Sequence, residues 1–200
     1  MTTSVLIRAE SKPSPGSAAR MHAAITSPAR RIVACLWRLC LLACLVAPLN
    51  AAYANDLVVG APAPPIALHT LDGKTIDLQA LRGKVVIVTF WATWCEPCRE
   101  ELPLLSRYAR EHADQGLVVL GFSLDAPEDL DKVRAVAGKL EFPVGLLGDP
   151  HVPGYGRIWR LPVSFTIDRS GRLVEDGWKE RPPEWTAKRL ERVVTPLLER

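Results

Sequence analysis

Cysteine is scarce in this chain of 200 residues. Of its five cysteines, Cys35, Cys40 and Cys44 lie in an apolar stretch near the N-terminus, so only Cys95 and Cys98 are left for the rest of the chain. A small domain held together by disulfides has more cysteines in a shorter chain, and a zinc ribbon needs a second pair of Cys or His ligands at similar spacing. The scarcity excludes both classes and leaves one cysteine pair for thiol chemistry.

The chain also lacks a surplus of positive charge outside its N-terminus. The formal net charge is +3, but six of the 25 Lys and Arg residues and only one of the 22 Asp and Glu residues precede position 55, so the remainder carries −2. A nucleic-acid-binding domain carries a clustered basic surplus, and we therefore expect no nucleic-acid partner. The length and the 48% apolar content suit about one globular domain.

A hydrophobic run long enough to span a membrane is missing too. The longest uncharged apolar run, Leu39 to Leu49, has 11 residues, whereas a spanning helix needs about 20. Three arginines precede this run and small residues up to Ala54 follow it, which is the pattern of a secretory signal. We predict a leader over residues 1–54, cleaved after Ala54, and a periplasmic or other extracytoplasmic location for the rest.

Several alternatives for this leader stay open. Met21 is a second candidate for the start, because a signal of 54 residues is long. Residues 32–54 are a candidate membrane anchor that faces outward if the segment is not cleaved. The residues before Cys44 loosely resemble a lipoprotein processing site, and two adjacent arginines weakly resemble a twin-arginine export signal. Each alternative still places residues 55–200 outside the cytoplasm, where a free dithiol must be kept reduced actively.

The rest of the chain alternates strand patterns with helix patterns. Residues 55–65 contain three prolines and are expected to form an extended segment that leads into a domain over 66–200. The elements expected in that domain are, in chain order, a hairpin of 66–71 and 75–78, a buried strand over 85–91, a helix that begins at the cysteines and is kinked by Pro103, a strand over 117–124, a helix from Pro127 to Gly138, a short strand over 144–147, a hairpin of 163–167 and 172–174, and a helix over 184–200. This order predicts an α/β fold in which one sheet has helices on both faces.

The two remaining cysteines form a Cys-Glu-Pro-Cys sequence between the buried strand and the following helix. At a helix N-terminus, free amides and the helix dipole favour the thiolate of Cys95, which is the species that attacks a disulfide. Cys98, on the same turn, is close enough to attack the mixed disulfide and release the partner in reduced form. Pro97 stiffens the turn and supplies no amide, whereas Glu96 places a negative charge beside the sulfurs and restrains their oxidising power.

Two other uses of this cysteine pair have less support. A stabilising disulfide across two intervening residues removes little entropy from the unfolded chain. A metal site could recruit His69, His112 or His151 as further ligands, but three scattered histidines do not form a ligand pattern. Thiol–disulfide exchange is favoured over both, and we expect no metal or other cofactor.

Two longer motifs resemble a known family. They are Phe-Trp-Ala-Thr-Trp-Cys-Glu-Pro-Cys-Arg-Glu-Glu-Leu-Pro at 90–103 and Leu-Pro-Val-Ser-Phe-Thr-Ile-Asp-Arg-Ser-Gly at 161–171. With these motifs the chain resembles the exported thioredoxin-like reductases of the TlpA/ResA group from about Ala61 to its C-terminus. The resemblance implies a thioredoxin-like fold with a central mixed sheet, an N-terminal hairpin extension and a central αβ insertion over 125–161.

The resemblance implies roles for individual residues. Cys95 matches the exposed nucleophile, and Cys98 matches the buried resolving thiol. Pro162 matches a cis-proline whose loop faces the disulfide, where Leu161 offers main-chain groups to a bound substrate; an ordinary trans proline is the alternative. Glu101 matches a buried acid that tunes the ionisation of the thiols in the ResA branch, and a solvated helix glutamate is the alternative.

The sequence departs from cytoplasmic thioredoxins at Thr89, where they carry a buried acid six residues before the first cysteine. Proton transfer during release of the partner then needs another base, for which Glu101 is the candidate. Trp94 is expected to shape the surface that substrates contact, together with Glu96 and Pro97 beside it.

These observations predict an exported thiol:disulfide oxidoreductase that acts as a monomer and reduces disulfides in other exported proteins. Similar proteins act on the haem-attachment cysteines of apocytochrome c or on copper-site cysteines, and receive electrons from a membrane thiol–disulfide transporter; the resemblance implies the same partners here. A disulfide donor with the same site is one alternative. Another is a copper metallochaperone that uses the cysteine pair and His151, although such chaperones space their cysteines by three residues. A peroxidase is disfavoured because Ala92 stands where a peroxidase has Thr.

Overall fold

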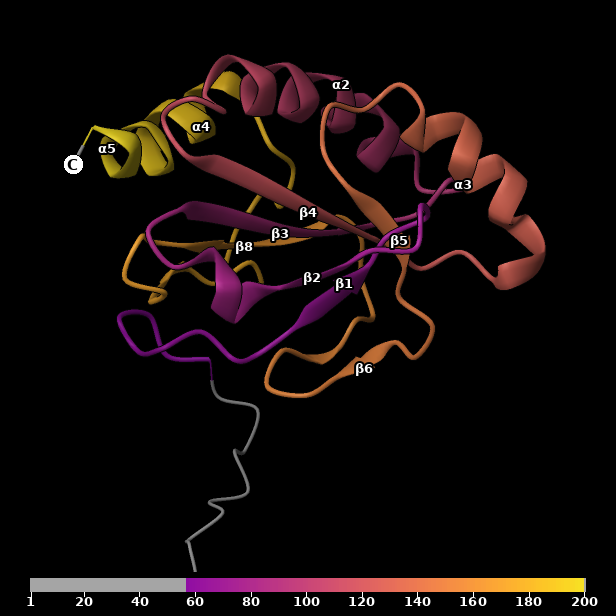
Figure 1. Ribbon diagram of the computed structural model, residues 1–200, viewed down its shortest axis with the longest axis horizontal. Helices are drawn as coiled ribbons and strands as arrows, with labels where there is room; N and C mark the ends of the chain where they lie inside the picture. The colour runs from indigo at the N-terminus through magenta and orange to yellow at the C-terminus, as the bar shows by residue number, and fades with distance from the viewer. Residues whose placement is uncertain (1–56, 200) are drawn as a thin grey trace, which may run out of the picture. The chain divides into compact units, whose positions relative to one another are not determined.

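A five-stranded mixed sheet in the order β5-β4-β3-β8-β9 lies at the centre of the computed structural model, which describes residues 57–199 (Figure 1). The predicted leader, its cleavage site and its alternatives lie outside these residues. Strand β3 (Val85–Trp91) is buried over all seven residues and pairs in parallel with β4 (Leu117–Ser123) and antiparallel with β8 (Val163–Ile167). A continuous run of β-branched and aromatic residues suits a strand that is covered on both faces, and the predicted strand over 85–91 is confirmed.

The sheet has one edge strand on each side. Strand β5 (Val144–Leu146) extends the sheet in parallel beside β4, and β9 (Leu173–Glu175) closes the other side as the partner of β8. The segment before the first hairpin lies along β9, because the Gly60 amide donates to the Leu173 carbonyl (2.7 Å) and the Leu173 amide donates to the Ala61 carbonyl (2.9 Å). These bonds satisfy part of an edge that would otherwise be open.

Helices cover one face of the sheet. In Figure 1, α2 (Glu96–Glu111) runs above the strands, with α4 (Ala187–Val193) and α5 (Thr195–Leu198) at one end and α3 (Leu130–Ala137) at the other. Their apolar side chains share one buried cluster with the strands and with both cysteines; its members include Ile87, Trp91, Cys95, Cys98, Leu102, Leu105, Val133, Leu190 and Leu198. Cys95 and Cys98 therefore belong to the core on the helical face.

Short hairpins cover the opposite face. These are β1 (Ala67–His69) with β2 (Thr75–Asp77), and β6 (His151–Val152) with β7 (Gly156–Arg157). The 3₁₀ helix η1 (Leu78–Leu81) follows β2 and contributes Leu78 to the same face. The cluster on this face is rich in aromatic rings and includes Phe90, Phe122, Tyr155 and Phe165. Within residues 57–199, no α-helix contributes a buried side chain to this cluster, so the expectation of helices on both faces is met here only by η1. The aromatic rings of this cluster fill the space between the sheet and the hairpins.

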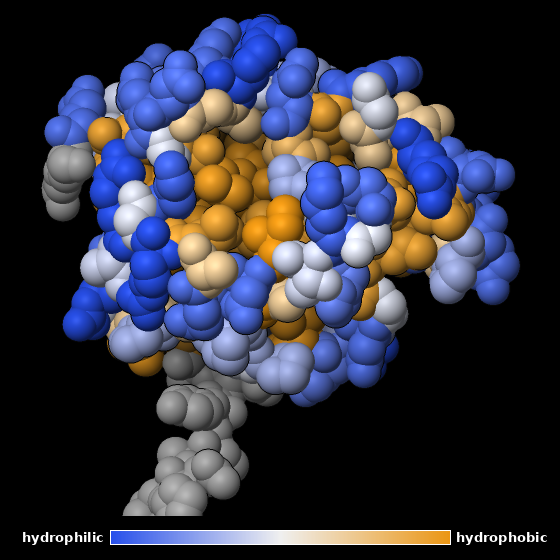
Figure 2. All heavy atoms as spheres, viewed as in Figure 1, coloured by the Kyte–Doolittle hydropathy of each residue, from blue (hydrophilic) through white to orange (hydrophobic). Residues whose placement is uncertain are grey.

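Apolar and hydrophilic residues are distributed unevenly over the viewed surface. Figure 2 shows apolar side chains in the middle of the viewed face, with hydrophilic side chains of the helices above them and of the hairpins below. In the part of the chain that the structure describes, no helix is long and apolar enough to cross a membrane.

The C-terminal helix differs from the prediction of one helix over 184–200. Helix α4 begins after Thr186, whose side chain accepts a hydrogen bond from the Arg189 amide (3.2 Å), and ends before Val194; α5 is a separate short helix. The break has a local cause, because Pro196 has no amide proton and cannot continue the hydrogen-bond ladder of α4. The residues from Pro183 to Thr186 precede α4 and are irregular, and the Trp185 amide in this segment donates a hydrogen bond to Glu101 of helix α2.

Candidate active site

The cysteine pair lies where β3 delivers the chain to α2. Cys95 is the N-cap residue of α2, and its sulfur accepts a hydrogen bond from the Cys98 amide (3.2 Å). Glu96 and Pro97 follow as the first two helical residues, and Cys95 and Cys98 are joined by a disulfide with 5.3 Å between their Cα atoms. Proline is well suited to the first turn, since its missing amide would have no helical partner there. The predicted position of the pair at a helix N-terminus is confirmed.

Burial distinguishes the two cysteines less than the resemblance implies. Cys98 is completely buried, and Cys95 keeps 6% of its surface exposed rather than being an open nucleophile. The reason is local: the Cys95 side chain turns inward to cap the helix and to bond the buried Cys98 sulfur. Of the two, Cys95 is nevertheless the one with any solvent contact.

Glu101 lies one helical turn beyond Cys98 on the buried face of α2. Only 3% of its surface is exposed, so it is not a solvated helix glutamate. Its Oε2 accepts a hydrogen bond from the Trp185 amide (2.6 Å), while Oε1 has no hydrogen-bond partner among the described residues. Burial raises the pKa of Glu101 to about 7, although the Trp185 amide and the charge of Arg189 oppose this rise. The carboxyl group can thus hold or release a proton near neutral pH.

The loop before β8 contains Leu161 and Pro162, the other residues predicted to belong to the site. The Leu161–Pro162 peptide is cis, Pro162 is buried, and Leu161 packs against the cluster that contains both cysteines. On the neighbouring strand, Thr89 is buried and its Oγ1 accepts a hydrogen bond from the Ser164 hydroxyl (2.8 Å). Thr89 therefore stands where cytoplasmic thioredoxins carry a buried acid, and its hydroxyl group is paired with that of Ser164. Neither hydroxyl group can serve as a base near neutral pH.

Two tryptophans near the predicted site residues are exposed. Trp94, directly before Cys95, is 65% exposed, and its neighbours Glu96 and Pro97 are exposed as well. Trp159, which the sequence did not predict as a site residue, stands two residues before Leu161 and is 70% exposed. Its ring stacks on Trp178 with 5.8 Å between the ring centroids. Tryptophan side chains are enriched at surfaces that contact other proteins.

Asp125, also absent from the predicted site residues, fixes the loop in front of the cysteines. Its buried carboxylate accepts hydrogen bonds from the Thr93 amide (2.9 Å), the Thr93 hydroxyl (2.5 Å) and the Ser123 hydroxyl (2.6 Å). A usable signal was present, because Asp125 follows a buried strand that runs parallel to the strand ending at the cysteines. Polar residues at the ends of such neighbouring strands meet at one edge of the sheet.

The histidines considered as metal ligands have other surroundings. His69 Nδ1 lies 3.0 Å from the Thr75 hydroxyl, His112 Nδ1 lies 2.9 Å from the Tyr108 carbonyl oxygen, and His151 is exposed in β6. Over residues 57–199, no three His, Cys, Asp or Glu side chains gather in a group that could hold a metal ion.

The chain is similar to known proteins over most of the residues that the structure describes. Residues 59–175 match the AhpC/TSA family. The thiol-disulfide oxidoreductase ResA of Bacillus cereus is 31% identical over 140 residues, which cover 70% of this chain and 81% of that protein.

Solved structures show the same likeness. A thiol:disulfide interchange protein of the thioredoxin family from Chlorobium tepidum is 28% identical with a TM-score of 0.54, over 72% of this chain and 99% of that chain. The thioredoxin domain of a thiol-disulfide oxidoreductase from Bacteroides vulgatus is 29% identical with a TM-score of 0.52, over 60% of this chain and 87% of that chain. The expected thioredoxin-like α/β fold is confirmed.

Proposed function

Because the chain belongs to the AhpC/TSA family as a thiol-disulfide oxidoreductase of the TlpA/ResA type, we propose that it reduces disulfides in other exported proteins. The observation that carries this proposal is the buried carboxyl group of Glu101, one turn beyond Cys98 on the same face of α2.

The reaction proceeds in two exchange steps. In the reduced protein, the Cys95 thiolate attacks one sulfur of a client disulfide, and the client's other sulfur leaves as a thiolate. Cys98 then loses its proton and attacks the Cys95 sulfur, which forms the Cys95–Cys98 disulfide and breaks the bond between Cys95 and the client. The second client sulfur leaves as a thiolate, and both client thiolates take up protons from the solvent. Glu101 accepts the Cys98 proton, since its pKa of about 7 lets the carboxylate form exist at neutral pH.

The direction of transfer follows from charge. A disulfide donor is a strong oxidant because its reduced form is stabilised, chiefly by a favoured thiolate. Glu96 in the first turn of α2 and the buried Glu101 both place negative charge on the cysteine side of that helix when ionised, and so disfavour the thiolate. Their presence supports a reductant.

A client would contact the rim of the disulfide. Trp94, Glu96 and Pro97 present exposed surface on one side, and Leu161 before the cis-proline Pro162 offers main-chain groups on the other. An extended client segment could pair with the free main chain there, as peptides do when they add to an exposed strand.

The location and partners complete the proposal. The signal pattern of residues 1–54 supports export. Candidate clients are the haem-attachment cysteines of apocytochrome c or copper-site cysteines, and the dithiol would be restored by a membrane thiol–disulfide transporter. Two sulfurs carry both electrons of each turnover, so a monomer without cofactor suffices.

The decisive experiment is the reduction potential of the cysteine pair. The purified protein is equilibrated with thiol buffers of defined potential, and alkylation is read by mass on the peptide that contains Cys95 and Cys98. The Cys98→Ser variant, which cannot close the disulfide, gives the fully reduced signal. A potential near or below about −220 mV supports the reductase, whereas a value near −120 mV makes the protein a disulfide donor.

A further inference from the structure

A buried cation lies close to the active-site carboxyl group. Arg189, on α4, is only 5% exposed, and its guanidinium pairs with the buried Glu175 of β9 through Nε to Oε1 (3.1 Å) and Nη2 to Oε2 (3.0 Å). The Thr166 hydroxyl donates to the same Oε2 (3.2 Å). Removing both ions from water costs several kcal/mol, and a buried pair is weak evidence for stability by itself.

Arg189 also holds the irregular segment that precedes α4. Its Nη1 donates to the carbonyl oxygens of Pro183 and Glu184. Its guanidinium lies over the ring of the buried Trp185, 4.0 Å from the ring centroid. The main chain and the side chain of this segment are therefore both fixed by one residue.

The same segment supplies the hydrogen bond to Glu101. The amide of Trp185 donates to Glu101 Oε2 at 2.6 Å, which engages one carboxyl oxygen and leaves Oε1 as the atom that can carry a proton. A continuous series of contacts thus runs from Glu175 through Arg189 and Trp185 to Glu101.

We propose that Arg189 is a positioning residue of the thiol–disulfide reaction: it holds the Trp185 amide against Glu101 Oε2, so that Glu101 exchanges its proton through Oε1. The inference rests on the proposed role of Glu101 as the proton acceptor for Cys98. Arg189 does not touch the sulfurs, and it acts only through the segment that it holds.

The charged groups facing Glu101 give the direction of the effect. Burial raises its pKa to about 7, the Trp185 amide and Arg189 oppose the rise, and Glu184 adds to it. Loss of Arg189 removes a positive charge and weakens the hydrogen bond from the Trp185 amide to Glu101. Both changes favour the protonated form of Glu101. The pKa of Glu101 should therefore rise further.

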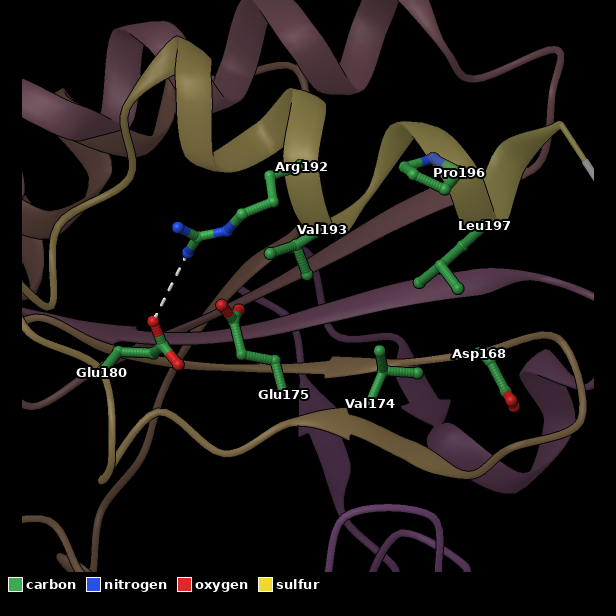
Figure 3. A pocket seen from close by; sticks show the side chains of 8 residues that line it. All are labelled: Asp168, Val174, Glu175, Glu180, Arg192, Val193, Pro196 and Leu197. Atoms are coloured by element: carbon green, nitrogen blue, oxygen red, sulfur yellow. Dashed lines mark ion pairs between the residues drawn. The ribbon is translucent and has the colours of Figure 1, made fainter.

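The chain offers a matched control on the same helix. Figure 3 shows a pocket between β9 and the C-terminal helices, where Arg192 faces Glu180 across the opening and Glu175 projects from the strand side. The Arg192–Glu180 pair spans 3.7 Å, and the Arg192 side chain is 63% exposed. Arg192→Met removes the same charge from α4 without a contact to the segment that holds Glu101.

The test measures the ionisation of Glu101 directly. In reduced protein with ¹³C-labelled glutamate, the carboxyl signal that disappears in Glu101→Gln is followed against pH. Arg189→Met is expected to raise the pKa by about one unit. Arg189→Lys should raise it less, because it keeps the charge but cannot make all the bonds of the planar fork. Arg192→Met should leave it unchanged, and a shift in Arg189→Met no larger than this control overturns the inference.

A second readout separates this inference from the proposed function. The pH profile of Cys95 alkylation should move with the pKa of Glu101 in Arg189→Met. If the pKa of Glu101 moves and the alkylation profile does not, Glu101 is not coupled to the cysteines, and its proposed role falls together with that of Arg189. If Arg189→Met fails to fold because Glu175 is left unpaired, the double variant Arg189→Met/Glu175→Gln removes the stranded charge and is measured in its place.

Discussion

Two buried carboxylates flank the cysteine motif, and they are bound in opposite ways. Asp125 accepts three hydrogen bonds from Thr93 and Ser123 and so ties the loop before Cys95 to the end of β4. Glu101, on the helix after Cys98, accepts one hydrogen bond, and its Oε1 has no partner among residues 57–199.

The difference separates an anchor from a titrating group. A buried carboxylate that accepts several hydrogen bonds, as Asp125 does, holds the donor groups around it in place. A buried carboxylate with a bare oxygen favours the neutral form, because burial penalises its charge. Rigidity before the cysteines and proton exchange after them are thus assigned to different acids.

The two cysteines are the reacting groups of the proposed exchange, so the largest effect is expected when they are replaced. With dithiothreitol as reductant and a disulfide-containing protein as client, Cys95→Ser should reduce turnover to the rate without protein, because the attacking sulfur is gone. Cys98→Ser should still attack and remain joined to the client, visible as a mixed disulfide on a non-reducing gel. The leader cysteines are replaced by Ser in all samples, and client trapped by Cys95→Ser would contradict the assigned roles.

Asp125→Ala should reduce the stability of the fold. It leaves the Thr93 amide and two hydroxyl groups without their acceptor, and the free energy of unfolding should fall by about 2–4 kcal/mol. Urea denaturation of the oxidised protein measures the change. Asp129→Ala, which breaks the exposed contact with Lys132, is the matched control and should leave stability unchanged. If the free energy of unfolding changes equally in the two variants, Asp125 does not stabilise the fold more than a surface acid does.

Glu101→Gln should change the pH dependence of stability. Because the pKa of Glu101 is raised from 4.5 to about 7 in the folded protein, the folded chain keeps a proton that the unfolded chain has lost between these values, and stability falls as pH rises through this window. The fall should approach about 3 kcal/mol.

The variant lacks this contribution, so the stability difference between the two proteins should grow from pH 4.5 to pH 7 in favour of Glu101→Gln. Urea denaturation at pH 4.5, 6 and 8 measures it, and all other titrating groups cancel in the comparison. A difference that does not depend on pH would place Glu101 with Asp125 as an anchor.

Trp94→Ala should have the smallest effect. The loop that Asp125 fixes presents this exposed ring beside Cys95, and its loss should raise KM for a protein client about fivefold, or about 1 kcal/mol. The rate with a small disulfide should not change, because such a substrate does not reach the ring. Val59→Ala, at an exposed apolar residue near the start of the described chain, is the control, and an equal KM for both variants would exclude Trp94 from client binding.

Local patterns accounted for much of this fold. The strand over 85–91, the two Gly-containing hairpins and the helix beginning at the cysteines follow from β-branched runs, turn residues and apolar spacing. The hairpin of β6 and β7 escaped prediction, because strands of two residues carry no readable period. The break between α4 and α5 was readable from Pro196 but was missed.

The position of the cysteines was determined by the sequence, since a Cys-x-x-Cys motif at a strand–helix junction is a local feature. The surroundings that tune them were decided by tertiary structure. Trp185 is 84 residues from Glu101 and Asp125 is 32 residues from Thr93, and no local pattern predicts such partners. The burial of Glu101 and the donors available to each carboxylate arise only when these distant segments pack together, and they decide which acid anchors and which can exchange a proton.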